Sequence, residues 1–278
     1  MMSNILYLVA TPIGNLSDIS ERALETLSKV DFIAAEDTRH TLKLLNHFDI
    51  KKPMVSYFEH NKKERGEYII GRIKEGESCA LVTDAGTPAI SDPGEDIVAQ
   101  CAEEGIDVVP VPGPCAFVQA LIISGLPTGR FSFEGFLSVN KPQRKKHLDE
   151  IKEMPHTLIF YEAPHKLITT LKDLYSAFGD RRISLVKEIT KIHETVIRTT
   201  LKDAQSLFDD ASPKGEFVLV VEGYVKTEES LEITDDIILA HAKKLIESGI
   251  DKKSAIKQTA QELNIQKRIV YSLVTENL

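Results

Sequence analysis

The sequence predicts an α/β protein made of two α/β lobes, followed by a small helical domain. Short apolar runs bounded by turn-forming residues alternate with segments of helical periodicity over residues 5–222. This alternation is typical of sheets whose faces are covered by helices. Beyond residue 233 the helical spacing continues without further strand-like runs.

The first lobe, residues 1–115, is expected to hold a doubly wound, mainly parallel sheet. Strands are expected at 5–10, 31–35, 54–58, 79–82 and 106–111. Helices are expected between them at 19–30, around 42–48, at 61–75 and at 95–104. A helix between each pair of strands favours parallel pairing, because a parallel crossover needs a long connection.

The second lobe, residues 116–224, is expected to differ in its sheet. A helix at 116–123 leads into it, and strands are expected at 131–136, 157–161, 183–187, 194–200 and 217–222. Its other helices are expected at 142–153, 164–178 and 201–209. Because only a short turn separates two of these strands, we expect a mixed sheet.

The third segment, residues 233–278, is predicted to be three short helices at 235–248, 252–262 and 266–277. An acidic, polar linker at 223–232 precedes it. The last two helices have helix-turn-helix spacing, and five cations give local positive charge: Lys252, Lys253, Lys257, Lys267 and Arg268. A small packing bundle and a contact with nucleic acid explain this pattern equally well.

Composition narrows the class of protein. The chain has 278 residues, 42% of them apolar and 27% charged, as in ordinary globular proteins. A net charge of −8 argues against a protein that coats nucleic acid, although it permits a local basic patch. The three cysteines form no CxxC pair, the N-terminus lacks the basic region of a signal peptide, and no apolar run reaches membrane-spanning length. We therefore expect a cytoplasmic location.

Residues 83–94 form the stretch most indicative of a ligand site. A buried strand ends there in a long loop that contains Asp84, Gly86, Pro88, Asp92 and Pro93. Ligands of open α/β sheets bind beyond the carboxyl ends of the strands, where such loops lie. An ordinary strand-to-helix turn is the alternative, but ordinary turns need fewer residues.

The sequence lacks the short motifs that mark several common classes of enzyme and metal-binding protein. It contains no GxGxxG, GxxxxGK[ST], HExxH or GxSxG pattern and no EF-hand loop. No metal is therefore expected, and the chemistry is assigned to shaped loops and dispersed polar groups.

Six stretches, taken together and in order, resemble one family. They are residues 8–15, 35–39, 83–94, 112–114, 160–165 and 187–191. They resemble the tetrapyrrole-methylase-like superfamily of S-adenosylmethionine (SAM) enzymes. Within it, they are similar to the branch that methylates the ribose 2′-hydroxyl of a cytidine in small-subunit ribosomal RNA.

The resemblance implies a homodimer in which SAM is held in a cleft between the two lobes. By position, the implied cofactor contacts in the first lobe are Pro12, Asp84, Ala85, Gly86, Thr87 and Ile90. Those at the lobe junction and in the second lobe are Cys115, Ala116, Glu162, Ile189, Gly215 and Phe217. Cys115 stands where the family often has a small hydroxyl residue.

The chemistry needs a group that activates the hydroxyl and groups that hold RNA. We predict that Lys187 or Glu188 activates the hydroxyl and that Arg39 holds a phosphate. A structural ion pair is the alternative for each of them, and equally for Glu36 and Asp37. The basic run at 141–147 is the candidate RNA contact, through Lys141, Arg144, Lys145 and Lys146. Exposed aromatic rings suited to RNA bases are expected among Tyr57, Phe58 and Phe136, unless they belong to the core.

Two other functions remain open from the sequence. A SAM-dependent tetrapyrrole methyltransferase would share the loop, but a small substrate needs neither the basic run nor the helical tail. A non-catalytic, ribosome-associated RNA-binding protein would not need the elaborate loop at 83–94. Binding of SAM and of RNA to the purified protein would distinguish the three.

Overall fold

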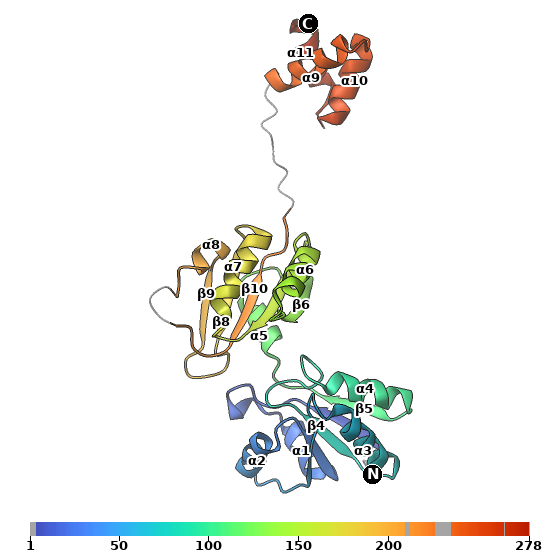
Figure 1. Ribbon diagram of the computed structural model, residues 1–278, viewed down its shortest axis with the longest axis vertical. Coiled ribbons are helices and arrows are strands. Elements are labelled where there is room, and N and C mark those ends of the chain that lie inside the picture. Colours follow the sequence, from blue (N-terminus) through green and yellow to red (C-terminus); the bar gives the residue numbers. More distant parts are fainter. Residues whose placement is uncertain (1–3, 209–211, 226–234, 264, 278) are drawn as a thin grey trace. The chain divides into compact units, whose positions relative to one another are not determined.

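The computed structural model describes residues 4–208, 212–225, 235–263 and 265–277. The chain divides into two compact units, Met1–Tyr224 and Val225–Leu278. The first unit contains two five-stranded sheets, one in each lobe (Figure 1). Among the described helices, none combines the length and the apolar character that a membrane crossing requires.

The first lobe is built on a fully parallel sheet with the strand order β3-β2-β4-β1-β5. Its strands are β1 (Ile5–Val9), β2 (Phe32–Ala35), β3 (Met54–Ser56), β4 (Cys79–Val82) and β5 (Asp107–Val111). A short 3₁₀ turn, η1 (Leu16–Asp18), follows β1. The prediction of a doubly wound parallel sheet is confirmed.

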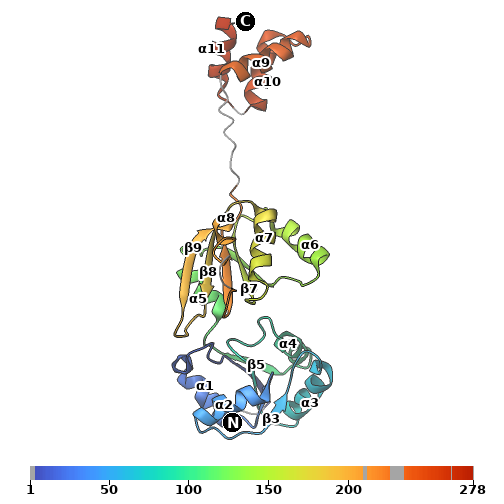
Figure 2. The same cartoon turned by 60° about the vertical axis from the view of Figure 1, so that its left-hand side comes forward.

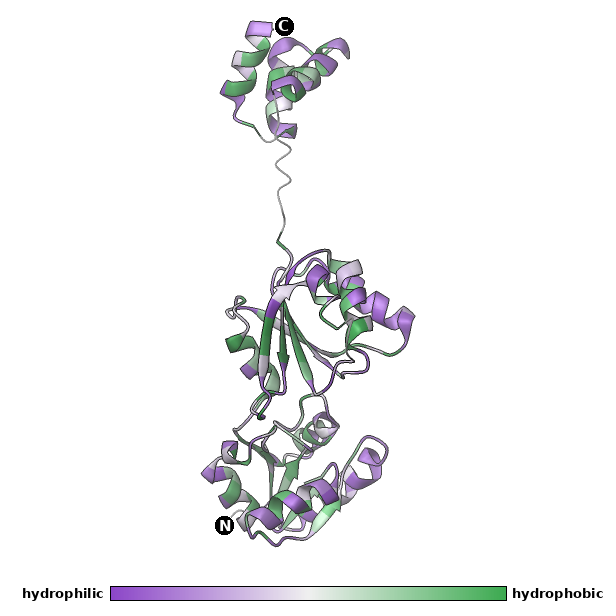
Figure 3. Ribbon diagram, turned by 90° about the vertical axis from the view of Figure 1, so that its left-hand side faces the viewer, coloured by the Kyte–Doolittle hydropathy of each residue, from purple (hydrophilic) through white to green (hydrophobic). Residues whose placement is uncertain are grey.

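Two pairs of helices cover the two faces of this sheet (Figure 2). Helices α1 (Glu21–Lys29) and α2 (Thr38–His47) pack on one face, and α3 (Lys62–Lys74) and α4 (Gly94–Glu103) pack on the other. Burial on both faces explains why the strands appear in the sequence as continuous apolar runs. Figure 3 shows this pattern, with hydrophobic strands inside and hydrophilic residues on the outer sides of the helices.

The second lobe has a mixed sheet in the order β6-β7-β10-β8-β9, as predicted. Its strands are β6 (Phe131–Phe136), β7 (Thr157–Glu162), β8 (Arg182–Lys187), β9 (Thr195–Thr200) and β10 (Phe217–Val221). Strands β6 and β7 are parallel, and the other pairs are antiparallel.

The two faces of the second sheet are covered unequally. Helices α6 (Lys141–Ile151), α7 (Leu167–Phe178) and α8 (Leu201–Ala204) pack on one face, whereas α5 (Ala116–Ile123) packs on the other. The predicted helix at 201–209 is wrong in length, because α8 ends at Ala204. From Gln205 to Leu207 each backbone N–H bonds to the carbonyl three residues back, which is the tighter pattern of a turn, and residue 209 lies outside the described chain.

The second unit contains three helices: α9 (Asp235–Glu247), α10 (Lys252–Glu262) and α11 (Lys267–Asn277). They bury a small apolar core around Ile238, Ile256, Val270 and Val274. Asp251 caps α10, because its carboxylate accepts the N–H groups of Lys253 and Ser254 at 3.1 Å. The predicted linker at 223–232 lies mostly outside the described residues.

Candidate active site

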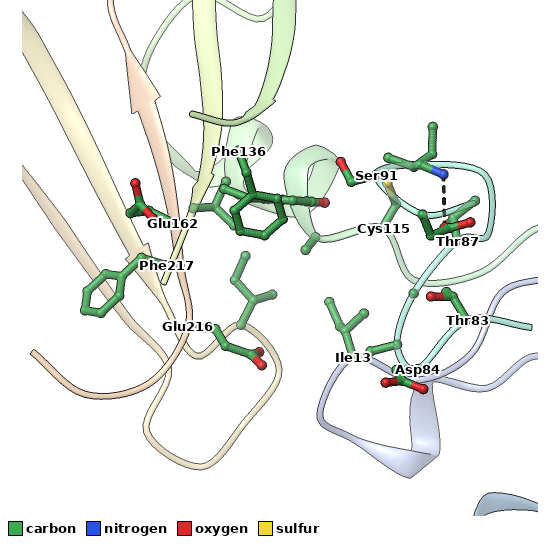
Figure 4. A pocket seen from close by; sticks show the side chains of 18 of the residues that line it. Ile13, Thr83, Asp84, Thr87, Ser91, Cys115, Phe136, Glu162, Glu216 and Phe217 are labelled. Carbon is green, nitrogen blue, oxygen red and sulfur yellow. Dashed lines mark hydrogen bonds between the residues drawn. The ribbon is translucent and has the colours of Figure 1, made fainter. Parts of the chain in front are cut away.

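A cavity of about 530 Å³ lies between the two lobes of the first unit (Figure 4). It opens at the carboxyl edge of the first sheet, where the loops after β1, β2, β4 and β5 meet the second lobe. The first lobe and the lobe junction contribute Ile13, Glu36, Thr83, Asp84, Ala85, Gly86, Thr87, Ile90, Ser91, Asp92, Cys115 and Ala116. The second lobe contributes Phe136, Tyr161, Glu162, Ala163, Pro164, Val186, Ile189, Glu216, Phe217 and Val218.

The loop after β4 is shaped from within by Asp92. One carboxylate oxygen of Asp92 accepts the N–H groups of Gly94 at 2.7 Å and Ala89 at 3.0 Å, and the other accepts that of Ile90 at 3.3 Å. Burial raises the pKa of this carboxyl group above its ordinary value. Ala89 and Ser91 have left-handed φ angles of 66° and 65°, which few residues adopt without such support. The hydrogen bonds of Asp92 therefore hold this loop in one defined conformation.

Gly86 lets the backbones of two loops meet at the cavity wall. Its N–H donates to the carbonyl of Thr11 at 3.0 Å, and the Thr11 N–H donates to the carbonyl of Gly86 at 2.9 Å. The φ angle of Gly86 is +86°, and a Cβ atom there would lie 3.2 Å from Cγ2 of Ile13. Glycine suits this backbone conformation, and a Cβ atom would require the Ile13 side chain to shift by a few tenths of an ångström.

The carboxylates of Glu36 and Asp84 lie side by side on the first-lobe wall. Glu36 accepts a hydrogen bond from the Thr83 hydroxyl at 2.6 Å, and Asp84 accepts one from the backbone N–H of Asp37 at 3.1 Å. Partial burial and the neighbouring Glu36 carboxylate raise the pKa of Asp84.

The charges around the cavity are of one sign. Glu36, Asp84, Asp92, Glu162 and Glu216 line it, and within the described part of the chain no lysine, arginine or histidine does so. A cation would relieve the crowding of these carboxylates, whereas a phosphate group would be repelled. The cavity therefore suits a cationic ligand.

The second-lobe wall of the cavity contains buried apolar residues beside a buried carboxylate. Phe217 is 2% exposed, and Val186 and Val218 beside it are buried. Buried Glu162 is held by two hydrogen bonds: one oxygen accepts from the Thr170 hydroxyl at 2.5 Å, and the other accepts from the Ala163 N–H at 2.9 Å. Val186, Ile189 and Val218 of this wall pack in one apolar cluster, which we call the apolar wall.

An ion-pair network reaches the edge of the cavity through Glu216, which lines it. Nζ of Lys191 lies 2.9 Å from the Glu188 carboxylate and 3.0 Å from that of Glu216. Lys191 and the backbone N–H of Glu216 hold the pKa of Glu188 below its ordinary value. The stem of Lys191 also packs against Gly14 of the first lobe, so the network links the two lobes.

The structure brings ten of the twelve predicted cofactor contacts to the cavity. Those that line it are Asp84, Ala85, Gly86, Thr87, Ile90, Cys115, Ala116, Glu162, Ile189 and Phe217. Pro12 and Gly215 are not among the lining residues, and their chain neighbours Ile13 and Glu216 take those places. One hydrogen bond at this junction comes from the Thr87 hydroxyl, which donates to the carbonyl of Pro114 at 2.9 Å.

The residues predicted to activate the hydroxyl are not part of the cavity lining. The carboxylate of Glu188 is engaged by Lys191, and its lowered pKa makes it a weak base. Lys187 follows Val186 in β8, and successive strand residues point to opposite faces. Val186 lies on the α5 face of the sheet, whereas Lys187 pairs with Phe217, which packs in the core on the α7 face.

Arg39 lies at the start of α2, on the same edge of the sheet as the cavity. Its side chain is 89% exposed and forms a 2.9 Å ion pair with Asp37, which holds the pKa of Asp37 well below its ordinary value. Asp37 also caps α2 by accepting the Arg39 N–H at 2.8 Å. Arg39 forms an ion pair at this position, and its exposed guanidinium can also contact a phosphate.

The predicted basic run lies on the first turns of α6, and its members differ in their surroundings. Lys141, Lys145 and Lys146 are exposed. The side chain of Arg144 is only 12% exposed, lies 2.7 Å from the Asp173 carboxylate and donates to the carbonyl of Ser138. The structure therefore gives Arg144 a role in holding α6 against α7.

Sequence reasoning singled out some cavity residues only weakly and missed others. Glu36 and Tyr161 lie in the stretches that resemble the family, but the sequence assigns neither a function in the site. Phe136 is one of the three aromatic residues considered for RNA bases. Of the other two, Tyr57 is 1% exposed and donates its hydroxyl to the Pro93 carbonyl at 3.0 Å, so it belongs to the core, and Phe58 is 37% exposed. No local signal marked Val186, Glu216 or Val218, because the fold alone brings them to the cavity.

Solved structures with a similar fold include methyltransferases and a synthase. The chain superposes on diphthine synthase with a TM-score of 0.60 at 17% identity, over 79% of this chain and 90% of that one. It superposes on uroporphyrin-III C-methyltransferase from Thermus thermophilus with a TM-score of 0.55 at 20% identity, over 79% and 94%. The family model "Tetrapyrrole (Corrin/Porphyrin) Methylases" matches residues 5–205, so the chain belongs to this family.

Relatives of nearly the same length define the branch. The chain is 46% identical to a Synechocystis protein over 98% of both chains, and 49% identical to one from Halalkalibacterium halodurans over 96% of this chain and 93% of that one. A Bacillus subtilis relative is 46% identical over 96% and 92%. All three bear the name ribosomal RNA small subunit methyltransferase I, and the predicted family is thereby confirmed.

Proposed function

We propose that this protein transfers the methyl group of SAM to the ribose 2′-hydroxyl of a cytidine in small-subunit ribosomal RNA. The observation that carries this proposal is the acidic, partly apolar cavity between the lobes, in a chain of this family and branch. SAM combines a cationic sulfonium and an ammonium group with an adenine ring.

The residues present fit that cofactor. Asp84 and Glu36 offer negative charge to a cationic group. Burial, together with the neighbouring Glu36 carboxylate, raises the pKa of Asp84, and a bound cation would stabilise the charged form. Gly86 allows close approach to backbone donors and acceptors. The apolar wall of Val186, Ile189 and Val218 offers a surface for the flat adenine ring.

When bound, SAM supplies an activated methyl group attached to a good leaving group. The protein then contributes chiefly by positioning, which is worth several kcal/mol when the reacting atoms are held at about 3–3.5 Å. Asp92 fixes the loop of residues 86–94, and the Glu188–Lys191–Glu216 network holds the second lobe against Gly14. We no longer propose Glu188 as the base, because Lys191 occupies its carboxylate.

RNA is proposed to approach along the exposed cations at the rim. Phe136 ends β6 at the cavity, and Lys141 begins α6 five residues later, so the lysines of α6 start within about 18 Å of the cavity. Lys141, Lys145, Lys146 and Arg39 are the proposed phosphate contacts. Their position outside the acidic cavity keeps the RNA backbone away from its carboxylates.

Transfer of a labelled methyl group from SAM to unmethylated small ribosomal subunits, followed by nuclease mapping, tests the proposal. Label on a cytidine 2′-oxygen is the expected result. Label on a base, or none despite measurable SAM binding, would refute it. Naked RNA is assayed in parallel, because we propose the assembled subunit as the substrate.

We also propose that the protein is a cytoplasmic homodimer. Val118 and Ile122 of α5, which are 38% and 61% exposed, offer apolar surface for a second copy. Sedimentation equilibrium at micromolar concentration is expected to give twice the mass of one chain.

A further inference from the structure

A β-bulge in β6 decides which way Phe136 points. Phe133 pairs with Ile159 and Phe136 pairs with Tyr161, so three steps along β6 match two steps along β7. The register shifts between Phe133 and Gly135, and Gly135 has a left-handed φ of 63°. Bulges near active sites commonly re-aim a side chain in this way.

Without the extra residue, Phe136 would face the other side of the sheet. Side chains alternate along a strand, and Glu134 points toward α6, where its carboxylate lies 2.8 Å from the His147 ring. The bulge moves Phe136 onto the face of Ile159 and Tyr161, which is the cavity face. There its ring lines the cavity although 56% of the residue is exposed.

The ring of Phe136 is supported from behind. Its centroid lies 5.5 Å from that of Tyr161, and the Tyr161 ring contacts Phe133 at 4.9 Å. The hydroxyl of Tyr161 accepts the backbone N–H of Phe117 at 3.1 Å, and burial raises its pKa to about 12. Phe136 is thus the exposed end of a fixed row of aromatic rings.

The position of Phe136 favours the methyl acceptor over the cofactor. The apolar wall of Val186, Ile189 and Val218, where we propose the adenine ring, is buried, whereas Phe136 is 56% exposed and stands between Glu162 and Ser91 in Figure 4. A carboxylate-lined cavity repels phosphate but admits a neutral base and its ribose hydroxyl. RNA bases that proteins bind individually are unstacked and commonly rest on aromatic rings.

We infer that the target cytosine, turned out of the RNA, stacks on the ring of Phe136. This inference rests on the proposed function and names the residue that receives the acceptor nucleotide. The 2′-oxygen is two bonds from the carbon that carries the base, so a stacked base also orients the reacting hydroxyl.

The test compares four variants of the full chain on unmethylated small subunits: Phe136→Ala, Phe136→Leu, Phe136→Tyr and Phe131→Ala. Loss of one stacking partner should lower kcat/KM for the subunit about 5- to 100-fold in the alanine variant. The leucine variant should fall similarly, because it keeps apolar area without a π face, and the tyrosine variant should retain activity. Phe131, 43% exposed on the same strand, does not line the cavity and is the matched control.

The SAM dissociation constant and the melting temperature are measured for each variant. Both should stay close to the wild-type values, because the ring is exposed and is not part of the apolar wall proposed for the cofactor. Wild-type activity of the alanine or leucine variant would overturn the inference, as would weakened SAM binding that accounts for the loss. If the wild-type enzyme itself labels no cytidine 2′-oxygen, the proposed function fails first.

Discussion

Replacement of Gly86 by alanine tests whether the close approach of the loops after β1 and β4 serves the cofactor. The left-handed conformation, φ +86°, costs an alanine about 1–2 kcal/mol. The new Cβ would also lie 3.2 Å from the Ile13 side chain, which must then shift by a few tenths of an ångström. We expect a total loss of about 2–3 kcal/mol in the free energy of unfolding.

Gly105→Ala is the matched control for backbone strain. Gly105 has φ +68°, is exposed after α4, and a Cβ there would meet no described atom within 4 Å. It should lose only the conformational cost, about 1–2 kcal/mol. For a unit of this size each kcal/mol lowers the melting temperature by about 2–4 °C.

Calorimetric titration with SAM separates the two effects. Gly86→Ala should bind SAM at least about tenfold more weakly, a loss of roughly 1.4 kcal/mol, because Ile13 and the loop line the cavity. Gly105→Ala should bind it normally. Equal SAM affinity in the two variants would refute the placement of the cofactor over Gly86.

Three further outcomes are expected. Asp84→Asn should raise the melting temperature at neutral pH and weaken SAM binding. The raised pKa of Asp84 means that the native state disfavours the charged carboxyl group, and this loss of folding stability grows as the pH rises above 3.8. Glu188→Gln should lower the free energy of unfolding by about 1–3 kcal/mol at neutral pH. Calorimetry should show that this difference from wild type shrinks as the pH falls below 4.5, because the contacts that lower the pKa of Glu188 stabilise only its ionised form. Replacing Lys145 and Lys146 with alanine should reduce the salt slope of RNA binding by about 1–2, whereas Arg144→Ala should lower the melting temperature and leave that slope unchanged. Opposite signs, or an unchanged slope in the lysine variant, would contradict these assignments.

The predicted elements agree closely with the structure, since strands such as Cys79–Val82 and helices such as Lys252–Glu262 have strong local patterns. The long loop at 83–94 was recognisable because its glycines and prolines exclude regular structure. Errors occurred where local pattern is weak, as in the short helix after Thr200. Strand alternation predicts which face of the sheet the Lys187 side chain takes. It does not predict whether a cavity lies on that face.

Side-chain chemistry and short-range periodicity are properties of the sequence. The sequence by itself therefore determined the fold class, the family and most of the predicted first-lobe residues that line the cavity, such as Asp84 and Gly86. Only the tertiary structure decided which second-lobe residues meet them, since contacts such as that of Lys191 with Gly14 join segments far apart in the chain. It also decided that Arg144 pairs with Asp173 and that a single extra residue in β6 turns Phe136 into the cavity. The physical reason is that strand pairing fixes which face each side chain takes, and a shift of one residue reverses it.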